Sequence, residues 1–366
     1  MKLSDITIEQ LQIPFKIAFS HSSASRTMTD SVLVKASTEF NDGYGESCPR
    51  EYVTNETYQS ASTFFKTHKA SLMESITSLE SLKQWMTNHQ DDIDKHPAAW
   101  CAIELAILDL LAKEQLCSVE KLLDLPELTG DYFYTAVLGD SSLESFSKLL
   151  AQYKAMGFSD YKIKLSGQLD HDKAKCDLIA EQIKNPRMRC DANNLWNNSE
   201  QVIEYIKQLN HAFFALEEPL KACDYEGLTL IANTLNLKII LDESFVKQQQ
   251  FDYLKDKPQN WIINIRISKM GGLLRALNIA EQAKHRGITC IAGAQVGETS
   301  ILTRAAITLV NVYRDVIIAQ EGGCGTYLLE KDISQPVLMF GLGGKISESQ
   351  ISNLNENGFG LKIECL

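Results

Sequence analysis

The sequence YKIKL, residues 161–165, places Lys162 and Lys164 between apolar residues. Successive side chains of a strand point to opposite faces, so both lysines would lie on one face and the apolar residues on the other. An isolated pair of this kind usually forms the solvated face of an edge strand, because lysine is rarely buried without a partner. The surrounding sequence must decide whether these lysines lie on a surface or in a core.

Short apolar runs recur along the chain before and after this one. They are YFYTAVL, YKIKL, MRCDAN, AFFALEE, LKIILDES, WIINIRIS, ITCIAGA and DVIIAQE, with centres near residues 135, 162, 189, 215, 240, 264, 290 and 317. Most of the gaps carry a helical pattern, such as SEQVIEYIKQLN at 199–210. Eight strand-and-helix units at near-constant spacing predict a (β/α)8 barrel of about 200 residues. A doubly wound open sheet is the alternative, but TAVLGDSS after the first strand lacks its Gly-rich phosphate turn.

The segments outside this repeat predict a second structural unit. SVLVKASTEFNDGYGES, residues 31–47, has two extended runs around NDG and predicts a hairpin. AAWCAIELAILDLLAKEQ, residues 98–115, is apolar nearly all round and predicts a buried helix. We therefore expect an α+β domain at 1–125, a barrel at 126–329, and a tail at 330–366 that folds back on the first domain.

Composition narrows the possible functions and locations. The chain has 366 residues, 44% of them hydrophobic, which is enough for a large core. The net charge of -11 and the absence of a Lys/Arg run argue against nucleic acid as a partner. No apolar run could span a bilayer, and MKLSDITIEQLQIPF resembles a strand rather than a signal peptide. The nine cysteines include no C-x-x-C pair, which suggests reduced thiols and a cytoplasmic protein. Cys101 and Cys290 lie in apolar runs and are expected to be packing residues.

Carboxylates stand at the ends of three successive predicted strands. Asp191, Glu217 and Asp242 follow the third, fourth and fifth apolar runs. Catalytic groups of a barrel lie at the C-terminal ends of its strands, so these side chains should converge. Three converging carboxylates repel one another unless a cation joins them, and an all-oxygen set of ligands suits one Mg²⁺ ion.

Lysines are predicted on both sides of this set. Lys162 and Lys164 come from the second strand, and Lys269 follows the sixth, in NIRISK. Positive charge from Lys162 and a metal ion would lower the pKa of Lys164 toward neutrality and let it act as a base. The arrangement predicts acid and base chemistry at a carbon atom.

Together these motifs resemble the enolase superfamily, in its muconate-lactonizing-enzyme subgroup, over nearly the whole chain. The motifs are YKIKL, CDANNLW, LEEPL, LDES and NIRISKMGGL. The resemblance implies an N-terminal α+β capping domain, completed by the tail, over a modified (β/α)7β barrel. It also implies one essential Mg²⁺ and removal of a proton α to a carboxylate, giving an enolate stabilised by the metal.

The resemblance assigns roles to individual residues. It implies Asp191, Glu217 and Asp242 as metal ligands. Lys164 and Lys269 would be the two acid/base catalysts, on opposite faces of the substrate, and Lys162 would bind the substrate carboxylate. The supporting groups around the metal and Lys269 would be Asn193, Asn264 and Glu243.

The N-terminal segment SHSSASRTMTDSVLVK, residues 20–35, resembles that of dipeptide epimerases. There, an arginine matching Arg26 meets the side-chain carboxylate of a glutamyl residue. The resemblance therefore favours a Mg²⁺-dependent epimerase that interconverts L-Ala-L-Glu and L-Ala-D-Glu by two-base proton transfer at the α-carbon of the second residue. The partner would be this small dipeptide, and we expect a homo-oligomer.

One departure concerns the substrate's ammonium group. Dipeptide epimerases carry D-x-D after the eighth strand, where this chain reads AQEGGCGTYLL, with Gly323 and Gly325 at the expected aligned positions. Glu321 and Glu298 are the candidate substitutes. Thr135 and Gln295 are further candidate substrate-binding residues, and the segment NDGYGES, 41–47, is expected either to close over the substrate or simply to make a turn.

Two alternatives follow from the same pattern. The first is another activity of the subgroup: a cycloisomerase, o-succinylbenzoate synthase or N-acylamino acid racemase. The second is a carboxylate-binding protein without catalysis on the same fold. A binding protein has no use for two facing proton-transfer lysines, so Lys164 and Lys269 argue against the second alternative.

Overall fold

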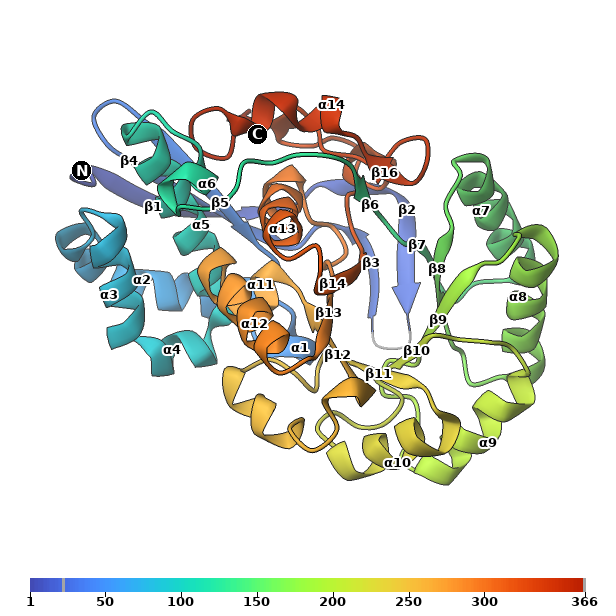
Figure 1. Ribbon diagram of the computed structural model, residues 1–366. Coiled ribbons are helices and arrows are strands. Elements are labelled where there is room, and N and C mark those ends of the chain that lie inside the picture. The colour runs from blue at the N-terminus through green and yellow to red at the C-terminus, as the bar shows by residue number, and fades with distance from the viewer. Residues whose placement is uncertain (22–23, 365–366) are drawn as a thin grey trace.

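An eight-stranded parallel sheet forms the centre of the computed structural model, which describes residues 1–21 and 24–364. Its strands lie in sequence order and curl into a barrel (Figure 1). They are β7 (Ala136–Leu138), β8 (Asp160–Lys164), β9 (Arg187–Asp191), β10 (Ala215–Glu217), β11 (Lys238–Leu241), β12 (Trp261–Ile265), β13 (Thr289–Ala292) and β14 (Ile317–Gln320). The amide of Thr135 donates to the carbonyl of Gln320 at 2.7 Å, which joins the first strand to the last. The predicted barrel is confirmed, and the open sheet is excluded.

Helices connect the strands around the outside of the barrel. They are α7 (Leu143–Ala155), α8 (Leu169–Gln182), α9 (Ser199–Leu209), α10 (Tyr225–Leu235), α12 (Leu273–His285) and α13 (Ser300–Val312), with the short α11 (Ile267–Met270) before α12. The connection from β11 to β12 has two 3-10 helices instead, η1 (Gln248–Tyr253) and η2 (Pro258–Asn260). Pro258 lacks a backbone N–H and disfavours helix in the residue before it, so a continuous helix cannot pass through this connection.

The N-terminal part combines a small sheet with helices. The antiparallel sheet has the order β1 (Asp5–Leu11), β4 (Ser31–Ser37), β5 (Asp42–Ser47). The helices are α1 (Glu51–Thr54), α2 (Tyr58–Ser75), α3 (Leu79–Asn88), α4 (Gln90–Lys95), α5 (Pro97–Glu114) and α6 (Val119–Leu122). The β4–β5 hairpin and the buried helix α5 confirm both predictions for this region.

The segment 41–47 was expected to close over the substrate, or its glycines simply to make a turn, and both expectations are wrong. Most of it is strand β5, which packs against α5. A Cβ atom on Gly43 would lie 2.2 Å from the carbonyl oxygen of Ala106, and one on Gly45 would lie 2.1 Å from that of Ala102. The glycines therefore allow the helix to approach the sheet closely.

A second hairpin, β2 (Pro14–His21) and β3 (Ala24–Met28), joins the N-terminal part to the mouth of the barrel. The amide of Lys16 donates to the carbonyl of Leu328 at 2.8 Å, in the segment after β14. A Cβ atom on Gly297, in the loop after β13, would lie 2.9 Å from the ring of Phe15. The base of this hairpin thus packs on the loops that follow the last two barrel strands.

The C-terminal tail links both parts of the molecule. It contains η3 (Gly325–Tyr327), β15 (Ser334–Gln335), β16 (Lys345–Ile346), α14 (Glu348–Ile351), η4 (Ser352–Asn355) and β17 (Lys362–Ile363). β16 pairs with β6 (Tyr132–Phe133), just before the barrel, and Gly358 exchanges backbone hydrogen bonds of 2.9 Å with Cys117 and Val119. The tail does fold back on the N-terminal part, while the exact domain boundaries remain a prediction.

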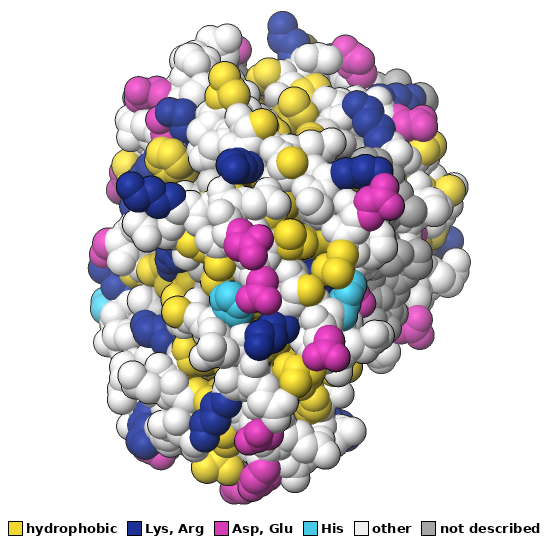
Figure 2. Space-filling view, turned by 90° about the vertical axis from the view of Figure 1, so that its right-hand side faces the viewer, with side chains coloured by type: hydrophobic (Ala, Val, Ile, Leu, Met, Phe, Trp, Pro, Cys, Tyr) yellow, Lys and Arg dark blue, Asp and Glu magenta, His cyan; other side chains and the backbone are white. Residues whose placement is uncertain are grey.

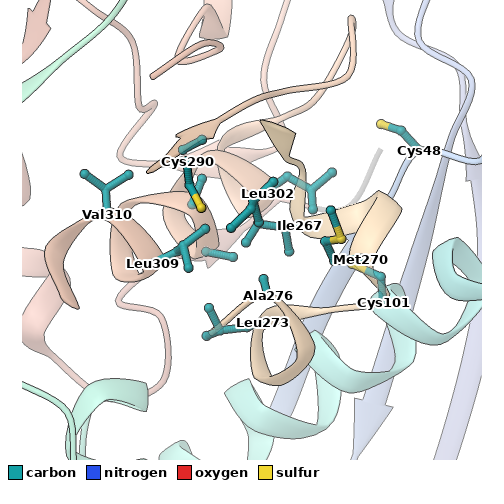
Figure 3. Close-up of a cluster of buried hydrophobic side chains, with 14 of the residues drawn as sticks. Cys48, Cys101, Ile267, Met270, Leu273, Ala276, Cys290, Leu302, Leu309 and Val310 are labelled. Atoms are coloured by element: carbon teal, nitrogen blue, oxygen red, sulfur yellow. The ribbon is translucent and has the colours of Figure 1, made fainter. Parts of the chain in front are cut away.

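Buried side chains fill the junction between the N-terminal helices and the barrel (Figure 3). The labelled residues are Cys48, Cys101, Ile267, Met270, Leu273, Ala276, Cys290, Leu302, Leu309 and Val310, all buried. Cys101 and Cys290 are fully buried, as expected of packing residues. Ile267 and Met270 anchor α11 in this core, and Lys269 lies on the same helix.

On the face seen in Figure 2, positive and negative side chains are interspersed, with hydrophobic side chains scattered among them. Among the residues that the structure describes, no helix is long and apolar enough to cross a membrane.

Candidate active site

Lys162 and Lys164 lie inside the barrel. They are 2% and 8% exposed, and both project from the inward face of β8. In the parallel register Lys164 is opposite Asp191 on β9, and Asp191 is opposite Glu217 on β10. The alternative of a solvated edge strand is therefore excluded, and the two ammonium groups must find partners in the core.

The three predicted carboxylates lie close to buried cations. Asp191, Glu217 and Asp242 are each 1% exposed. The Nζ atom of Lys162 lies 3.0 Å from Asp191 Oδ2 and 2.8 Å from Glu217 Oε2. Asp242 forms an ion pair of 2.9 Å with Lys269 and another with Arg266. The three carboxylates do lie at the mouth of the barrel. Lys162 lies between Asp191 and Glu217, and Arg266 lies between Glu217 and Asp242.

The type of donor fits a hard divalent cation, although the carboxylates are not gathered around one point. In the described part of the chain, no group of three His, Cys, Asp or Glu side chains is arranged to hold a metal ion. Glu217 Oε2 contacts Lys162 without the geometry of a hydrogen bond, and it accepts none from any other residue that the structure describes, so this buried oxygen can still take a ligand bond. Three buried carboxylates from adjacent strands are the ligands that Mg²⁺ prefers. Their role as metal ligands remains a prediction.

Lys269 is held on the side of the site opposite Lys164. It is fully buried, and its Nζ donates to the carbonyl of Asn264 at 2.7 Å and to the carbonyl of Asp242 at 2.8 Å. Burial lowers the pKa of Lys269, although the Asp242 carboxylate opposes this, and Arg266 lowers it further. A lysine with a lowered pKa can exchange a proton more readily at neutral pH.

The loop after β9 brings an amide to Lys164. Lys164 Nζ donates to Asp191 Oδ2 at 3.0 Å and to Asn193 Oδ1 at 2.6 Å. Asn193 has φ of 45° and Asn194 has φ of 60°, left-handed conformations that asparagine adopts more easily than most residues. The backbone N–H of Asn193 in turn donates to Asp191 Oδ1 at 3.0 Å, so this tight turn fixes the carboxylate beside the lysine.

The shared contacts change the pKa values of this group in opposite directions. For Lys162, burial disfavours the charge, but Asp191, Glu217 and Glu321 outweigh it and raise the pKa. For Asp191, burial is outweighed by Lys162 and Lys164, which lower the pKa. For Glu217, burial raises the pKa to about 7, with Lys162 opposing and Asp191 adding to the increase. Lys162 is therefore held as a cation.

Two buried arginines belong to the site and were not predicted. Arg266 is 9% exposed and lies between Asp242 and Glu217, 4.0 Å from the latter. Arg189 is fully buried, inside β9. Each stands two residues from a predicted site residue, Asn264 or Asp191. The backbone is extended at both places, so the two side chains of each pair lie on the same face. Alternation along NIRIS and RMRCD was the signal that could have found them.

Glu218, the neighbour of Glu217, ties three loops together. Its carboxylate accepts hydrogen bonds from the amide of Asp242 at 2.6 Å and from the amide and hydroxyl of Ser244, each at 2.8 Å. It also accepts one from the side chain of Asn194 at 3.3 Å. Glu218 has φ of 38°, an uncommon conformation for glutamate, so its backbone is strained. Its carboxylate is thereby placed where it binds the loops after β9, β10 and β11.

The other predicted residues fall into two groups. Gln295, Glu298, Glu243 and Asn264 lie near the mouth. Gln295 Oε1, Glu243 Oε2 and Asn264 Oδ1 are buried without hydrogen-bond partners among the described residues. Asn264 Nδ2 donates to Glu217 at 3.0 Å, and Glu298 accepts from the backbone amide of Gln295 at 2.7 Å.

Thr135 and Arg26 make other contacts. The hydroxyl of Thr135, at the start of β7, donates to Asp160 at 2.8 Å and accepts from Arg189 at 3.2 Å. Arg26 lies on β3 with its guanidinium 3.9 Å from the Asp30 carboxylate. Among the contacts of the described residues, neither side chain touches the three carboxylates. Its substrate-binding role therefore stays a prediction in both cases.

The chain thus combines a parallel barrel and an N-terminal α+β part with buried lysines on both sides of three buried carboxylates. Residues 145–346 match the Enolase C-terminal domain-like family. This match covers more than half of the chain, which therefore belongs to that family.

Similar proteins align over most of their length. The chain is 25% identical to the N-succinyl-L-Arg/Lys racemase of Bacillus cereus, covering 97% of this chain and 98% of that protein. It is 29% identical to the L-Ala-D/L-Glu epimerase of Francisella tularensis subsp. novicida, over 84% of this chain and 87% of that protein. The dipeptide epimerase of Enterococcus faecalis complexed with Mg and L-Leu-L-Tyr has the same fold, with a TM-score of 0.84 at 24% identity over 99% of this chain and 100% of that chain.

Proposed function

We propose that this protein is a Mg²⁺-dependent epimerase that inverts the α-carbon of the C-terminal residue of a dipeptide, most specifically L-Ala-L-Glu and L-Ala-D-Glu. The observation that carries the proposal is the pair Lys164 and Lys269, which enter the mouth of the barrel from opposite sides of Asp191, Glu217 and Asp242. Dipeptide epimerases among the similar proteins support it.

The two lysines would exchange a proton at one carbon. One neutral lysine removes the α-proton, and the electron pair of the broken C–H bond moves into the carboxylate to give an enolate. The other lysine, which starts as an ammonium, donates its proton to the opposite face of the same carbon. The roles of Lys164 and Lys269 reverse for the other stereoisomer, so the reaction is balanced without any other reactant.

Asp191, Glu217 and Asp242 would hold Mg²⁺, which supplies positive charge against the negative charge that develops on the substrate carboxylate. Lys162 contacts two of the three carboxylates, so it would lie close to that charge. Its raised pKa keeps it protonated, so it would bind the substrate carboxylate and not move protons.

A second candidate is racemisation of N-acylated amino acids. The similarity to the Bacillus cereus racemase extends over 97% of this chain, and the D-x-D pattern expected after the eighth strand is absent from AQEGGCG. A substrate with a neutral amide in place of the ammonium would not need those carboxylates. The chemistry at the α-carbon would be the same.

A panel of dipeptides and N-succinyl amino acids in heavy water separates these candidates. Each turnover through an enolate replaces the α-proton by deuterium, which mass spectrometry detects as a gain of about one dalton. The proposed function predicts exchange in Ala-Glu and its close relatives. Exchange confined to N-succinyl amino acids would support the racemase, and exchange in neither set would contradict both.

Arg26→Ala tests the preference for glutamate. An arginine paired with a carboxylate in a closed site makes a strong hydrogen bond, and its loss costs about 2 to 5 kcal/mol. After an allowance for water entering the gap, we expect kcat/KM for L-Ala-L-Glu to fall roughly tenfold to a thousandfold, with a much smaller loss for a dipeptide whose second residue is uncharged. An unchanged ratio of the two values would remove Arg26 from the specificity site.

A further inference from the structure

Glu321 follows β14, at the place where an anion for the substrate's ammonium was expected. It is 7% exposed, and its carboxylate contacts two cations of this chain. Lys162 Nζ lies 3.1 Å from Oε1 and 3.4 Å from Oε2, and Arg189 donates to Oε1 at 2.7 Å. These contacts outweigh burial and lower the pKa of Glu321 to about 2.

Arg189 fixes the position of this carboxylate from deeper in the barrel. It is fully buried, and beyond Glu321 it donates to Asp160 at 2.6 Å and to the hydroxyl of Thr135 at 3.2 Å. Thr135 itself donates to Asp160 at 2.8 Å. The guanidinium is thus held between strands β7, β8 and β14, and one end of it points to Glu321.

Lys162 is the other cation that contacts the Glu321 carboxylate. Its ammonium is shared among Asp191, Glu217 and Glu321, at distances of 2.8 to 3.1 Å. Without Glu321 only the two predicted metal ligands would attract it, and the side chain would move toward them. A buried carboxylate with two close cations is already neutralised, so it has little attraction left for a third.

We infer that Glu321 is a positioning residue for Lys162, held in place by Arg189, and that it is not the group that binds a substrate ammonium. The inference rests on the proposed function, because it assigns a role within the same site. It replaces the expectation that Glu321 substitutes for D-x-D. Glu298 accepts a hydrogen bond from the backbone of Gln295 and is then the remaining candidate for the ammonium.

Glu321→Gln tests the assignment with two substrates, L-Ala-L-Glu and its N-acetylated form, which lacks the ammonium. A misplaced Lys162 should lower kcat about tenfold to a hundredfold for both substrates and leave their kcat/KM ratio unchanged within about threefold. A loss at least tenfold larger for the free dipeptide overturns the inference. If only the free dipeptide reacts, a tenfold rise in KM at unchanged kcat overturns it. Glu330→Gln, at an exposed residue of the same region, is the matched control.

A double-mutant cycle tests the pairing of Arg189 with Glu321. Residues that act as a unit are not additive, so Arg189→Gln combined with Glu321→Gln should lose no more activity than the worse single variant. Additive losses would mean that Glu321 acts without Arg189. Circular dichroism tests whether each variant folds. Arg189→Lys, which keeps the positive charge but loses the two-nitrogen geometry of the guanidinium, replaces Arg189→Gln if that variant does not fold.

Crystal structures of the wild type and Glu321→Gln give a readout that needs no activity. We expect Lys162 Nζ to shift by about 1 Å or more toward Asp191 and Glu217 when its third partner is removed. An unmoved Lys162 overturns the inference. A wild type without activity on any dipeptide would contradict the proposed function, and this structural comparison would still decide the role of Glu321.

Discussion

Ala215, Ile240, Ile262 and Ile291 fill one side of the barrel interior, from β10 to β13, and all four are fully buried. The other side, formed by β8 and β9, has a charged residue at every inward position. These residues are Asp160, Lys162, Lys164, Arg187, Arg189 and Asp191. On the first side these apolar residues fill the middle of the strands, between the polar groups at the mouth and a hydrogen bond of 3.3 Å from Lys238 to Thr289 at the opposite end. On the second side charged residues extend through the length of the strands.

The two sides hold their functional groups by different means. On the apolar side Lys269 is fixed by its anchored helix, by two backbone carbonyls and by one carboxylate, that of Asp242. On the charged side Lys162 is fixed by carboxylates from β9, β10 and the segment after β14. Burial of apolar area is not directional, but each buried charge requires a partner at a defined place. Substitutions on the charged side should therefore disturb activity at a distance, and those on the apolar side should mainly change stability.

Metal removal should have the largest effect, because the three carboxylates join both sides. We expect EDTA to reduce activity to the background level, a loss on the order of a thousandfold or more, and Mg²⁺ to restore it. Asp242→Asn should not recover at ordinary Mg²⁺ concentrations. Initial rates of deuterium exchange measure both effects, and Asp315→Asn, at an exposed surface residue, is the control. Full activity of metal-stripped protein would refute the metal assignment.

Loss of either lysine should show that one catalyst comes from each side. Lys164→Ala and Lys269→Ala should each lower the rate of epimerisation by about 10² to 10⁴, because every turnover needs one base and one acid. Each variant should still exchange the α-proton of one stereoisomer, and the two variants should retain opposite stereoisomers. Polarimetry and mass spectrometry in heavy water distinguish the two reactions. Epimerisation by Lys269→Ala at the wild-type rate would disprove the two-base mechanism.

One substitution on each side compares their energetics directly. Arg189→Met removes a partner of the buried Glu321 carboxylate and of the partly buried Asp160 carboxylate. It should lower the free energy of unfolding by about 3 to 5 kcal/mol, with a loss of kcat. Ile262→Ala leaves a cavity and should cost about 2 to 5 kcal/mol, with kcat per folded molecule nearly unchanged. Urea denaturation and steady-state kinetics measure the two quantities. Equal losses of kcat in the two variants would contradict the claim that only the charged side acts on catalysis at a distance.

The smallest predicted effect concerns Glu46, which joins the N-terminal part to the loop after β13. Burial raises its pKa to about 8, although hydrogen bonds from Thr299 oppose the shift. The folded state therefore holds a proton that the unfolded state releases near the ordinary value of 4.5. Stability from this group is complete below that value and is lost as pH rises toward 8.

Relative to Glu46→Gln, the wild-type Tm should fall by about 2 °C or more between pH 5.5 and 8.5. A constant difference between the two proteins would contradict the shift, and Glu330→Gln should follow the wild type.

Strand positions and the residues at the strand ends could be predicted from the sequence, because both depend on local pattern. The regular recurrence of apolar runs located all eight barrel strands, and charge at their ends located Asp191, Glu217 and Asp242. The glycines of 41–47 show where local pattern was insufficient. They suggested a loop, but the reason for them is the approach of α5, and only the packed structure contains that contact.

The sequence by itself determined the barrel, the cap and which residues carry charge into the mouth, since alternation and spacing are properties of the chain. It could not determine which charges pair, because Glu321 and Lys162 are 159 positions apart and Arg189 and Glu321 are 132 positions apart. Closure of the barrel brings β14 beside β7, the neighbour of β8, and only then do these groups meet. Tertiary structure therefore decided that Glu321 contacts two buried cations, because a buried charge takes the partner that the fold places nearest to it.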